Sequence, residues 1–122
     1  MPTRTLEAHV RQHQPRVAVI ELHGEINSFA DETLSAAYAQ AEEQKPQSIL
    51  LNFSDVDYIN STGIALIVTL LAKARKAHIR LLTCGLSEHY IEIFNITRLA
   101  DFMSVYPDEM SALADKSELS EA

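Results

Sequence analysis

Short apolar segments that fit β-strands alternate along this chain with segments of helical periodicity. This alternation limits the fold more than any other feature of the sequence. The clearest strand is Ser48–Phe53 (SILLNF), whose nearly continuous apolar residues are typical of a strand covered on both faces. A helix is expected after it, from about Ser61 to Ala77, with an apolar stripe that starts at Ile64 and ends at Ala74. This pair predicts an α/β architecture.

The same patterns predict the remaining elements. Further strands are expected at Leu6–Val10, Arg16–His23, Ile79–Cys84 and Phe102–Tyr106, and further helices from near Phe29 to Ala41, Glu88 to Phe94 and Met110 to Ala114. Gly24 is expected to end the second strand, Ser54–Asn60 to form a loop, and His13-Gln14-Pro15 to form the turn of an antiparallel hairpin. Since strands joined by a crossover helix are normally parallel, we expect a mixed sheet of about five strands with an antiparallel N-terminal hairpin, packed against about four helices.

Chain length and composition fit one ordinary domain. The 122 residues are 47% hydrophobic and 22% charged, which is close to an average globular protein. No linker or repeat divides the sequence. We expect a single domain over residues 1–115, followed by a flexible acidic tail over residues 116–122.

Charge and hydropathy limit the partners. The net charge of −7 repels phosphodiester backbones, so direct binding of nucleic acid is not expected. The longest apolar run, Ile64–Ala72, is interrupted by Thr69 and is far shorter than the ~20 residues of a membrane span. The first residues lack an apolar secretory segment. A cytoplasmic protein without membrane insertion is the expectation.

The usual motifs of enzymes are missing. The sequence contains neither glycine-rich phosphate loop, GxGxxG or GxxxxGK[ST], and neither GxSxG nor HExxH. Cys84 has no second cysteine for a redox pair, and its position at a strand end favours a buried thiol. The five histidines lie in separate predicted elements without ligand spacing. We therefore expect no catalytic residues, no metal site and no cofactor.

One local motif stands out, Ile59-Asn60-Ser61-Thr62-Gly63, where a buried strand leads into a helix. The simpler interpretation is that Asn60 or Ser61 caps the helix. The functional interpretation is that Ser61 or Thr62 accepts a phosphate, because a helix N-terminus offers free N–H donors and a positive dipole end. Gly63 lacks a side chain, so a partner could approach the motif closely.

Three segments give the chain a resemblance to the STAS domain family of anti-sigma factor antagonists. Val17–Asn27 (VAVIELHGEIN) resembles the family's strand followed by G-E-[LI]-D. Ile49–Ile67 (ILLNFSDVDYINSTGIALI) resembles its apolar strand, the D-S-[ST]-G motif and the helix that follows. Ile79–Leu113 is a weaker match to the later elements. Together the three segments span nearly the whole chain.

The resemblance implies a regulatory binding protein in transcriptional signalling. Its partner would be a serine-kinase-type anti-sigma factor, which would phosphorylate the hydroxyl residue just before Gly63. That residue is Thr62, with Ser61 as the second choice. The phosphorylated form would release the kinase, and a PP2C-type phosphatase would restore binding. The partner-binding residues implied are Asn27, Asn60, Ser61, Thr62 and Gly63.

The chain departs from the family pattern at Asn27, Asn52 and Asn60, where aspartate is common. Capping survives this change, because asparagine caps a helix as well as aspartate does. Two consequences compete. A less acidic surface would accept a phosphate on Thr62 more easily, or the kinase would need the missing carboxylate and Thr62 would be a poor substrate.

Two other functions are compatible with the sequence. STAS domains also serve transporters, and this chain would then be a separate subunit that regulates a membrane permease. An enzyme would need Ser61 or Thr62 as nucleophile with a nearby base, for which His23 and His89 are the candidates. Neighbouring genes would separate the first two functions, since a kinase or phosphatase gene favours the antagonist and a permease gene favours the transporter subunit.

Overall fold

The structure is a computed structural model that describes residues 5–14 and 16–114. Within them five strands form one mixed sheet in the order β1-β2-β3-β4-β5, with β1 antiparallel to β2 and every later pair parallel. The predicted α/β fold with an antiparallel N-terminal hairpin is therefore confirmed. Pro15 of the predicted turn and the predicted tail at 116–122 lie outside the described residues.

The elements follow one another in the predicted order. The strands are β1 (Glu7–Gln14), β2 (Val17–Ile26), β3 (Ser48–Ile59), β4 (Arg80–Cys84) and β5 (Ser104–Tyr106). The α-helices are α1 (Asp31–Glu43), α2 (Ser61–Lys76), α3 (Glu88–Ile96) and α4 (Glu109–Ala114). Two short 3₁₀ helices, η1 (Ser28–Ala30) and η2 (Leu99–Asp101), precede α1 and follow α3.

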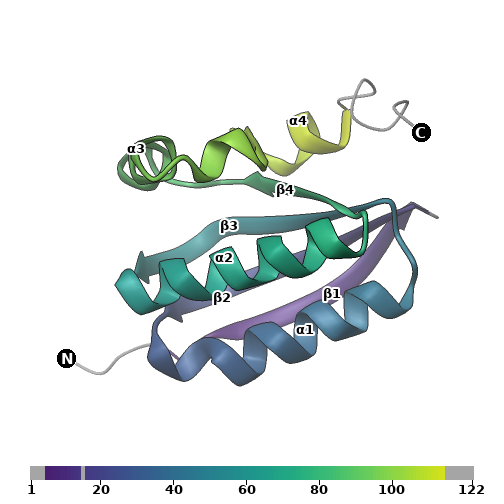
Figure 1. The fold of residues 1–122 in the computed structure, drawn as a ribbon, viewed down its shortest axis with the longest axis horizontal. Helices are drawn as coiled ribbons and strands as arrows, with labels where there is room; N and C mark the ends of the chain where they lie inside the picture. Colours follow the sequence, from purple (N-terminus) through teal and green to yellow (C-terminus); the bar gives the residue numbers. More distant parts are fainter. Residues whose placement is uncertain (1–4, 15, 115–122) are drawn as a thin grey trace.

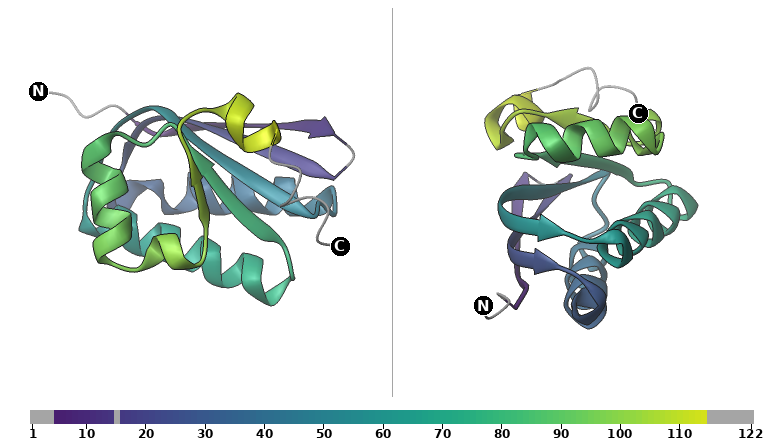
Figure 2. Two further views of the ribbon diagram at one scale, coloured as in Figure 1. Left: turned by 90° about the horizontal axis from the view of Figure 1, so that it is seen from above. Right: turned by 90° about the vertical axis from the view of Figure 1, so that its left-hand side faces the viewer.

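The helices cover the two faces of the sheet unequally. Helices α1 and α2 lie side by side along one face (Figure 1), where they enclose the larger core with Ile20, Ile49 and Leu51. Helix α3 adds Phe94 to the same core. The short α4 covers only part of the opposite face (Figure 2). Beneath it lies a smaller apolar cluster that includes Leu50. The rest of that second face carries polar side chains.

Strands β2 and β3 run further than the apolar pattern predicted. Gly24 does not end β2, and the segment expected as a loop, Ser54–Asn60, continues β3 as far as Ile59. The pairing of Ile26 with Ile59 holds this extension, although the register shifts twice on the way. Because α4 does not cover this part of the sheet, the segment carries polar side chains. Its sequence therefore resembles that of a loop. Gly24 adopts φ +112, and a Cβ there would lie 2.7 Å from the Thr5 carbonyl oxygen.

Helix α2 is the longest helix in the described part of the chain, with 16 residues. Among the helices of residues 5–14 and 16–114, none combines the length and the apolar character needed to cross a bilayer.

Candidate functional site

The predicted phosphoacceptor segment lies where β3 ends and α2 begins. Asn60 has an extended backbone, and its side-chain oxygen accepts a hydrogen bond from the Gly63 N–H at 2.8 Å. This is an N-cap, so the capping role expected of Asn60 or Ser61 is performed by Asn60. Ser61 and Thr62 form the first turn of the helix, and both are exposed. The cap and an accessible hydroxyl therefore occur together at this site.

Two neighbouring elements fix the position of this junction. The Asn60 N–H donates to the Ile26 carbonyl oxygen at 3.1 Å, which ties the start of α2 to the end of β2. The preceding Ile59 N–H donates to the hydroxyl of Tyr90 on α3 at 2.9 Å. These two hydrogen bonds, one to a backbone carbonyl and one to a side-chain hydroxyl, hold the junction against both β2 and α3.

Gly63 is buried, and its missing side chain is used inside the molecule. A Cβ at this position would lie 2.2 Å from the Ile26 carbonyl oxygen, far closer than any real contact. Helix α2 can approach β2 only because a glycine stands here. The sequence suggested that Gly63 leaves room for a partner, whereas in the structure Ile26 makes the close approach. A partner contact at Gly63 remains a prediction.

Asn27 stands beside this junction, just after the end of the neighbouring strand β2. It follows Ile26, the partner of Ile59 in the sheet, and its side-chain oxygen accepts from the Phe29 N–H at 2.9 Å. Asn27 is therefore the N-cap of the short 3₁₀ helix η1. Phe29 itself is 89% exposed. Only the turn geometry of η1, which contacts α2, reveals that this ring faces solvent beside the site.

The electrostatic environment of Thr62 is open to an added anion. The first turn of α2 contains no acidic residue, and its last turn contains Lys73, Arg75 and Lys76. The amino end of a helix carries a partial positive charge, which favours anions within the first turn. With an amide rather than a carboxylate at Asn60, the N-cap adds no charge of its own. A phosphate on Thr62 would therefore meet little repulsion from this helix.

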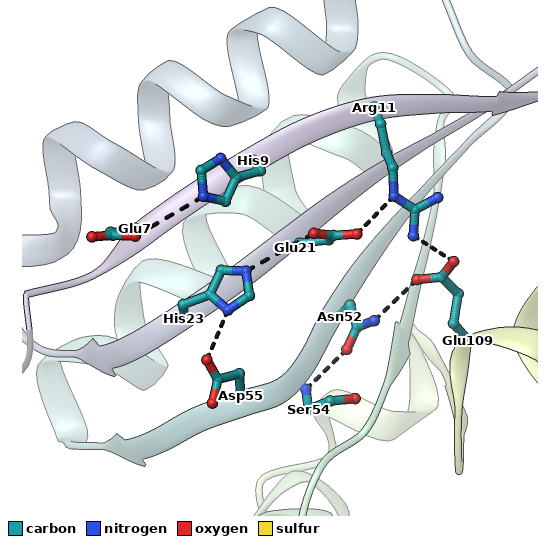
Figure 3. Close-up of polar contacts among 9 residues, drawn as sticks. All are labelled: Glu7, His9, Arg11, Glu21, His23, Asn52, Ser54, Asp55 and Glu109. Atoms are coloured by element: carbon teal, nitrogen blue, oxygen red, sulfur yellow. Dashed lines mark hydrogen bonds and ion pairs between the residues drawn. The ribbon is translucent and has the colours of Figure 1, made fainter.

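Asn52 is the remaining position at which asparagine stands where the family commonly has aspartate, and it does not belong to this site. It lies seven residues before Ile59 on β3, roughly 20 Å away at the usual strand rise. Its amide donates to Glu109 of α4 at 3.0 Å and accepts from the Ser54 N–H at 2.9 Å (Figure 3). Glu109 also pairs with Arg11 of β1. The asparagine at position 52 thus has a structural explanation, as a neutral donor to a carboxylate of α4.

A polar cluster occupies the uncovered face beyond α4. His23 on β2 holds Asp55 at 2.8 Å through Nδ1, and its Nε2 lies 3.9 Å from Glu21 (Figure 3). The His9 ring lies edge-on to the His23 ring, with centroids 5.5 Å apart. Within the described residues, no three histidine, cysteine, aspartate or glutamate side chains are placed to share a metal ion.

The two candidate catalytic bases, His23 and His89, have other contacts. His23 is engaged with Asp55, and the ring of His89 packs edge-on against Tyr90 with centroids 4.9 Å apart. Among the interactions of the described residues, neither imidazole bonds to Ser61 or Thr62.

Cys84 is fully buried beneath α4, as expected, and burial, with Glu109 and Asp108 nearby, raises the pKa of its thiol to about 12. A thiol with that pKa is inert as a nucleophile at neutral pH.

Residues 9–112 match the STAS domain family, and the chain belongs to this family. The protein BtrV of Bordetella bronchiseptica, provisionally named an anti-sigma factor antagonist, is 29% identical over 86 residues, which cover 70% of this chain and 72% of that protein. The anti-sigma-B factor antagonist of Staphylococcus epidermidis is 27% identical over 86 residues, covering 70% of this chain and 80% of that protein.

Solved structures share the fold. An anti-sigma factor antagonist from Mycobacterium paratuberculosis superposes with a TM-score of 0.77 at 20% identity, covering 89% of this chain and 92% of that one. The phosphorylated form of the Bacillus cell fate determinant SpoIIAA gives 0.68 at 21% identity, covering 87% and 96%. A sulfate transporter family protein from Wolinella succinogenes gives 0.74 at 22% identity, covering 87% and 88%. The same fold therefore occurs in proteins named for different roles.

Proposed function

We propose that this chain is an anti-sigma factor antagonist that binds a serine-kinase-type anti-sigma factor and is switched by phosphorylation of Thr62. The observation that carries the proposal is the exposed hydroxyl of Thr62 at the capped amino end of α2. The relatives named as anti-sigma factor antagonists support it. The kinase and a PP2C-type phosphatase would act on the same residue in the cytoplasm.

The switch follows from electrostatics. A phosphate adds about −1.5 to −2 charges at neutral pH. The amino end of α2 tolerates this charge in the free protein, because its N–H groups and dipole favour an anion. A partner whose contact surface was complementary to a neutral hydroxyl would have to desolvate the phosphate, which weakens binding. Phosphorylation therefore releases the partner without unfolding the antagonist.

Mass spectrometry tests this proposal directly. The chain is incubated with ATP and a serine-kinase-type anti-sigma factor from the same organism. We expect the mass to increase by one phosphate, with the fragment ions placing it on Thr62. Thr62→Ala should abolish the increase, and Ser61→Ala, which removes the adjacent exposed hydroxyl, should preserve it. A phosphate that is lost in Ser61→Ala and retained in Thr62→Ala would move the switch to Ser61, and no phosphate on any variant would refute it.

The partner surface is proposed to include Asn27, Asn60, Ser61 and Gly63 together with Thr62. Asn27 and Asn60 directly follow the ends of the neighbouring strands β2 and β3, and each caps the helix that follows it. Asn27→Ser retains a capping oxygen and removes the larger amide. We expect this variant to bind the kinase more weakly. Its unfolding midpoint should change no more than it does for an ordinary surface substitution. Equal affinity for Asn27→Ser and the parent chain would remove Asn27 from the interface.

A second candidate function is that of a soluble subunit regulating a membrane transporter, which the fold shared with the Wolinella succinogenes protein favours. Affinity capture separates the two. Capture from native lysate with the parent chain, Thr62→Ala and Thr62→Glu should recover a kinase that only the glutamate variant loses. Recovery of a permease with all three baits would support the transporter function instead.

A further inference from the structure

An apolar groove of about 520 Å³ runs along α2 beside the junction between α3 and η2. One wall consists of Ile64, Val68 and Leu71 from α2, and the other includes Leu99 and Phe102. Ile64 was expected in the core, yet it is only partly buried and lines the groove. Val68 is 44% exposed and Phe102 54% exposed. The groove therefore presents apolar surface to solvent in a chain of net charge −7.

Cations mark the far end of the groove. The guanidinium of Arg75 lies over the ring of Phe102, 4.9 Å from its centroid, and Arg98 also lines the groove. Arg98 is paired with Asp101 at 2.6 Å. Arg75 has no carboxylate within ion-pair distance among the described residues, and no acidic residue lines the groove. An occupant with carboxylates near Arg75 would thus complement the charge of this end.

The groove is continuous with the proposed switch. Ile64 lies two residues after Thr62 on the same helix, and the groove extends from Ile64 to Arg75 along α2. Eleven residues of helix correspond to about 16 Å, or three turns. A partner that covers Thr62 therefore also reaches the apolar wall, and three turns are enough to accept a short amphipathic helix.

We propose that this groove docks an amphipathic helix of the kinase-type anti-sigma factor, with apolar side chains against Val68 and Phe102 and carboxylates facing Arg75. The proposal rests on the proposed function, which it deepens by naming the contact that provides affinity. Aromatic and arginine side chains are enriched at the centre of protein interfaces, where a few residues carry most of the binding energy. Val68 and Phe102 are exposed at the edges of the two walls. A small ligand inside the groove would leave these two side chains in water, whereas a polypeptide would cover them.

The groove and the hydroxyl have separable roles. Groove contacts are made equally before and during phosphoryl transfer, so their loss should raise KM without lowering kcat. Thr62 is the reacting group, so its removal should abolish transfer and preserve binding. This separation distinguishes a docking groove from a merely structural surface.

The first test places the same negative charge inside and outside the groove. Val68→Glu should weaken binding of the kinase that phosphorylates the parent chain by about tenfold or more and raise KM for phosphorylation by a similar factor. The matched control is Met110→Glu, because Met110 is 80% exposed on α4 and packs in neither wall. Unfolding midpoints of both variants show whether the fold is kept. Equal affinities for Val68→Glu and Met110→Glu would overturn the proposal.

The second test removes a charge. Arg75→Gln should weaken kinase binding severalfold and reduce its salt dependence, whereas Arg16→Gln, an exposed cation before β2, should have neither effect. If both groove variants bind normally while the parent chain is phosphorylated on Thr62, the groove proposal fails and the proposed function stands. If the parent chain binds no kinase, the function fails. A change of oligomeric state in Val68→Glu would assign the groove to a second copy and overturn the proposal.

Discussion

A single amide, that of Asn60, connects the stability of α2 with the chemistry proposed for Thr62. Its oxygen caps the helix through the Gly63 N–H, and its neutrality keeps a negative charge away from the neighbouring hydroxyl. These two properties belong to different parts of the side chain, since an aspartate would retain the oxygen and add the charge. Substitutions at this residue can therefore separate capping from charge.

Asn60→Ala should lower the free energy of unfolding by about 1 kcal/mol, because the Gly63 N–H loses its acceptor. Asn60→Asp should leave stability equal or raise it by up to about 1 kcal/mol, because a carboxylate favours the positive end of a helix. Urea denaturation measures both. An Asn60→Asp chain as unstable as Asn60→Ala would show that the cap does not operate as described.

The amide of Asn52 has an equally specific role, as donor to the Glu109 carboxylate. Asn52→Asp would replace this bond with two facing carboxylates and should lower the free energy of unfolding by about 1–2 kcal/mol. Denaturation of the single variants and of the double variant with Glu109→Gln forms a thermodynamic cycle. The penalty should shrink in the Glu109→Gln background, where a carboxamide faces the new carboxylate. An unchanged penalty would mean that Asn52 acts through another group.

Glu109 should make stability depend on pH. Burial alone would raise the pKa of its carboxyl, but hydrogen bonds from Arg11 and Asn52 outweigh burial and hold that pKa below its ordinary value of 4.5. A lowered pKa means that the stabilisation is complete above the unfolded-state value and is lost as pH falls through the folded-state value. The stability difference between the parent chain and Glu109→Gln should therefore be constant near neutrality and shrink below the unfolded-state pKa. A difference that grew on acidification would contradict this sign.

At the scale of elements, α2 was predicted almost to the residue, while β3 was not. The helix has a cap at Asn60, a buried stripe and basic residues at its end, and each of these signals is local. The second half of β3 carries exposed Ser54, Asp55 and Tyr58 because no helix covers that face, so its sequence lacks the apolar pattern of a strand. The pairing with β2 that makes it a strand is a tertiary property.

The close contact between α2 and β2 gives the strongest stability prediction. Gly63→Ala would place a methyl group against the Ile26 carbonyl oxygen, which belongs to the backbone and cannot move aside. We expect a loss of about 3 kcal/mol or more, at the upper end of overpacking substitutions. Thr69→Ala, on the exposed side of the same helix, should change stability by no more than about 0.5 kcal/mol. Similar unfolding midpoints for the two variants would disprove the packing constraint.

At the scale of the whole molecule, the sequence predicted the hydroxyls of the site but not its surroundings. Ser61 and Thr62 could be located because a buried strand, a cap and an apolar helix adjoin them in sequence. The exposure of Phe29 and the Arg75–Phe102 pair could not be predicted, because the residues around each come from separate elements that only the fold brings together. Nor did the sequence show that the Asn52 amide donates a hydrogen bond to Glu109 of α4 and lies away from Thr62.

The central claim is that charge on Thr62 controls docking of the kinase-type anti-sigma factor. The most direct test compares the affinity of that kinase for the chain phosphorylated on Thr62 with its affinity for the unmodified chain, by titration calorimetry at fixed salt. The account predicts binding weaker by about 100-fold or more after phosphorylation, a loss of about 3 kcal/mol. Equal affinity for the two forms would contradict it.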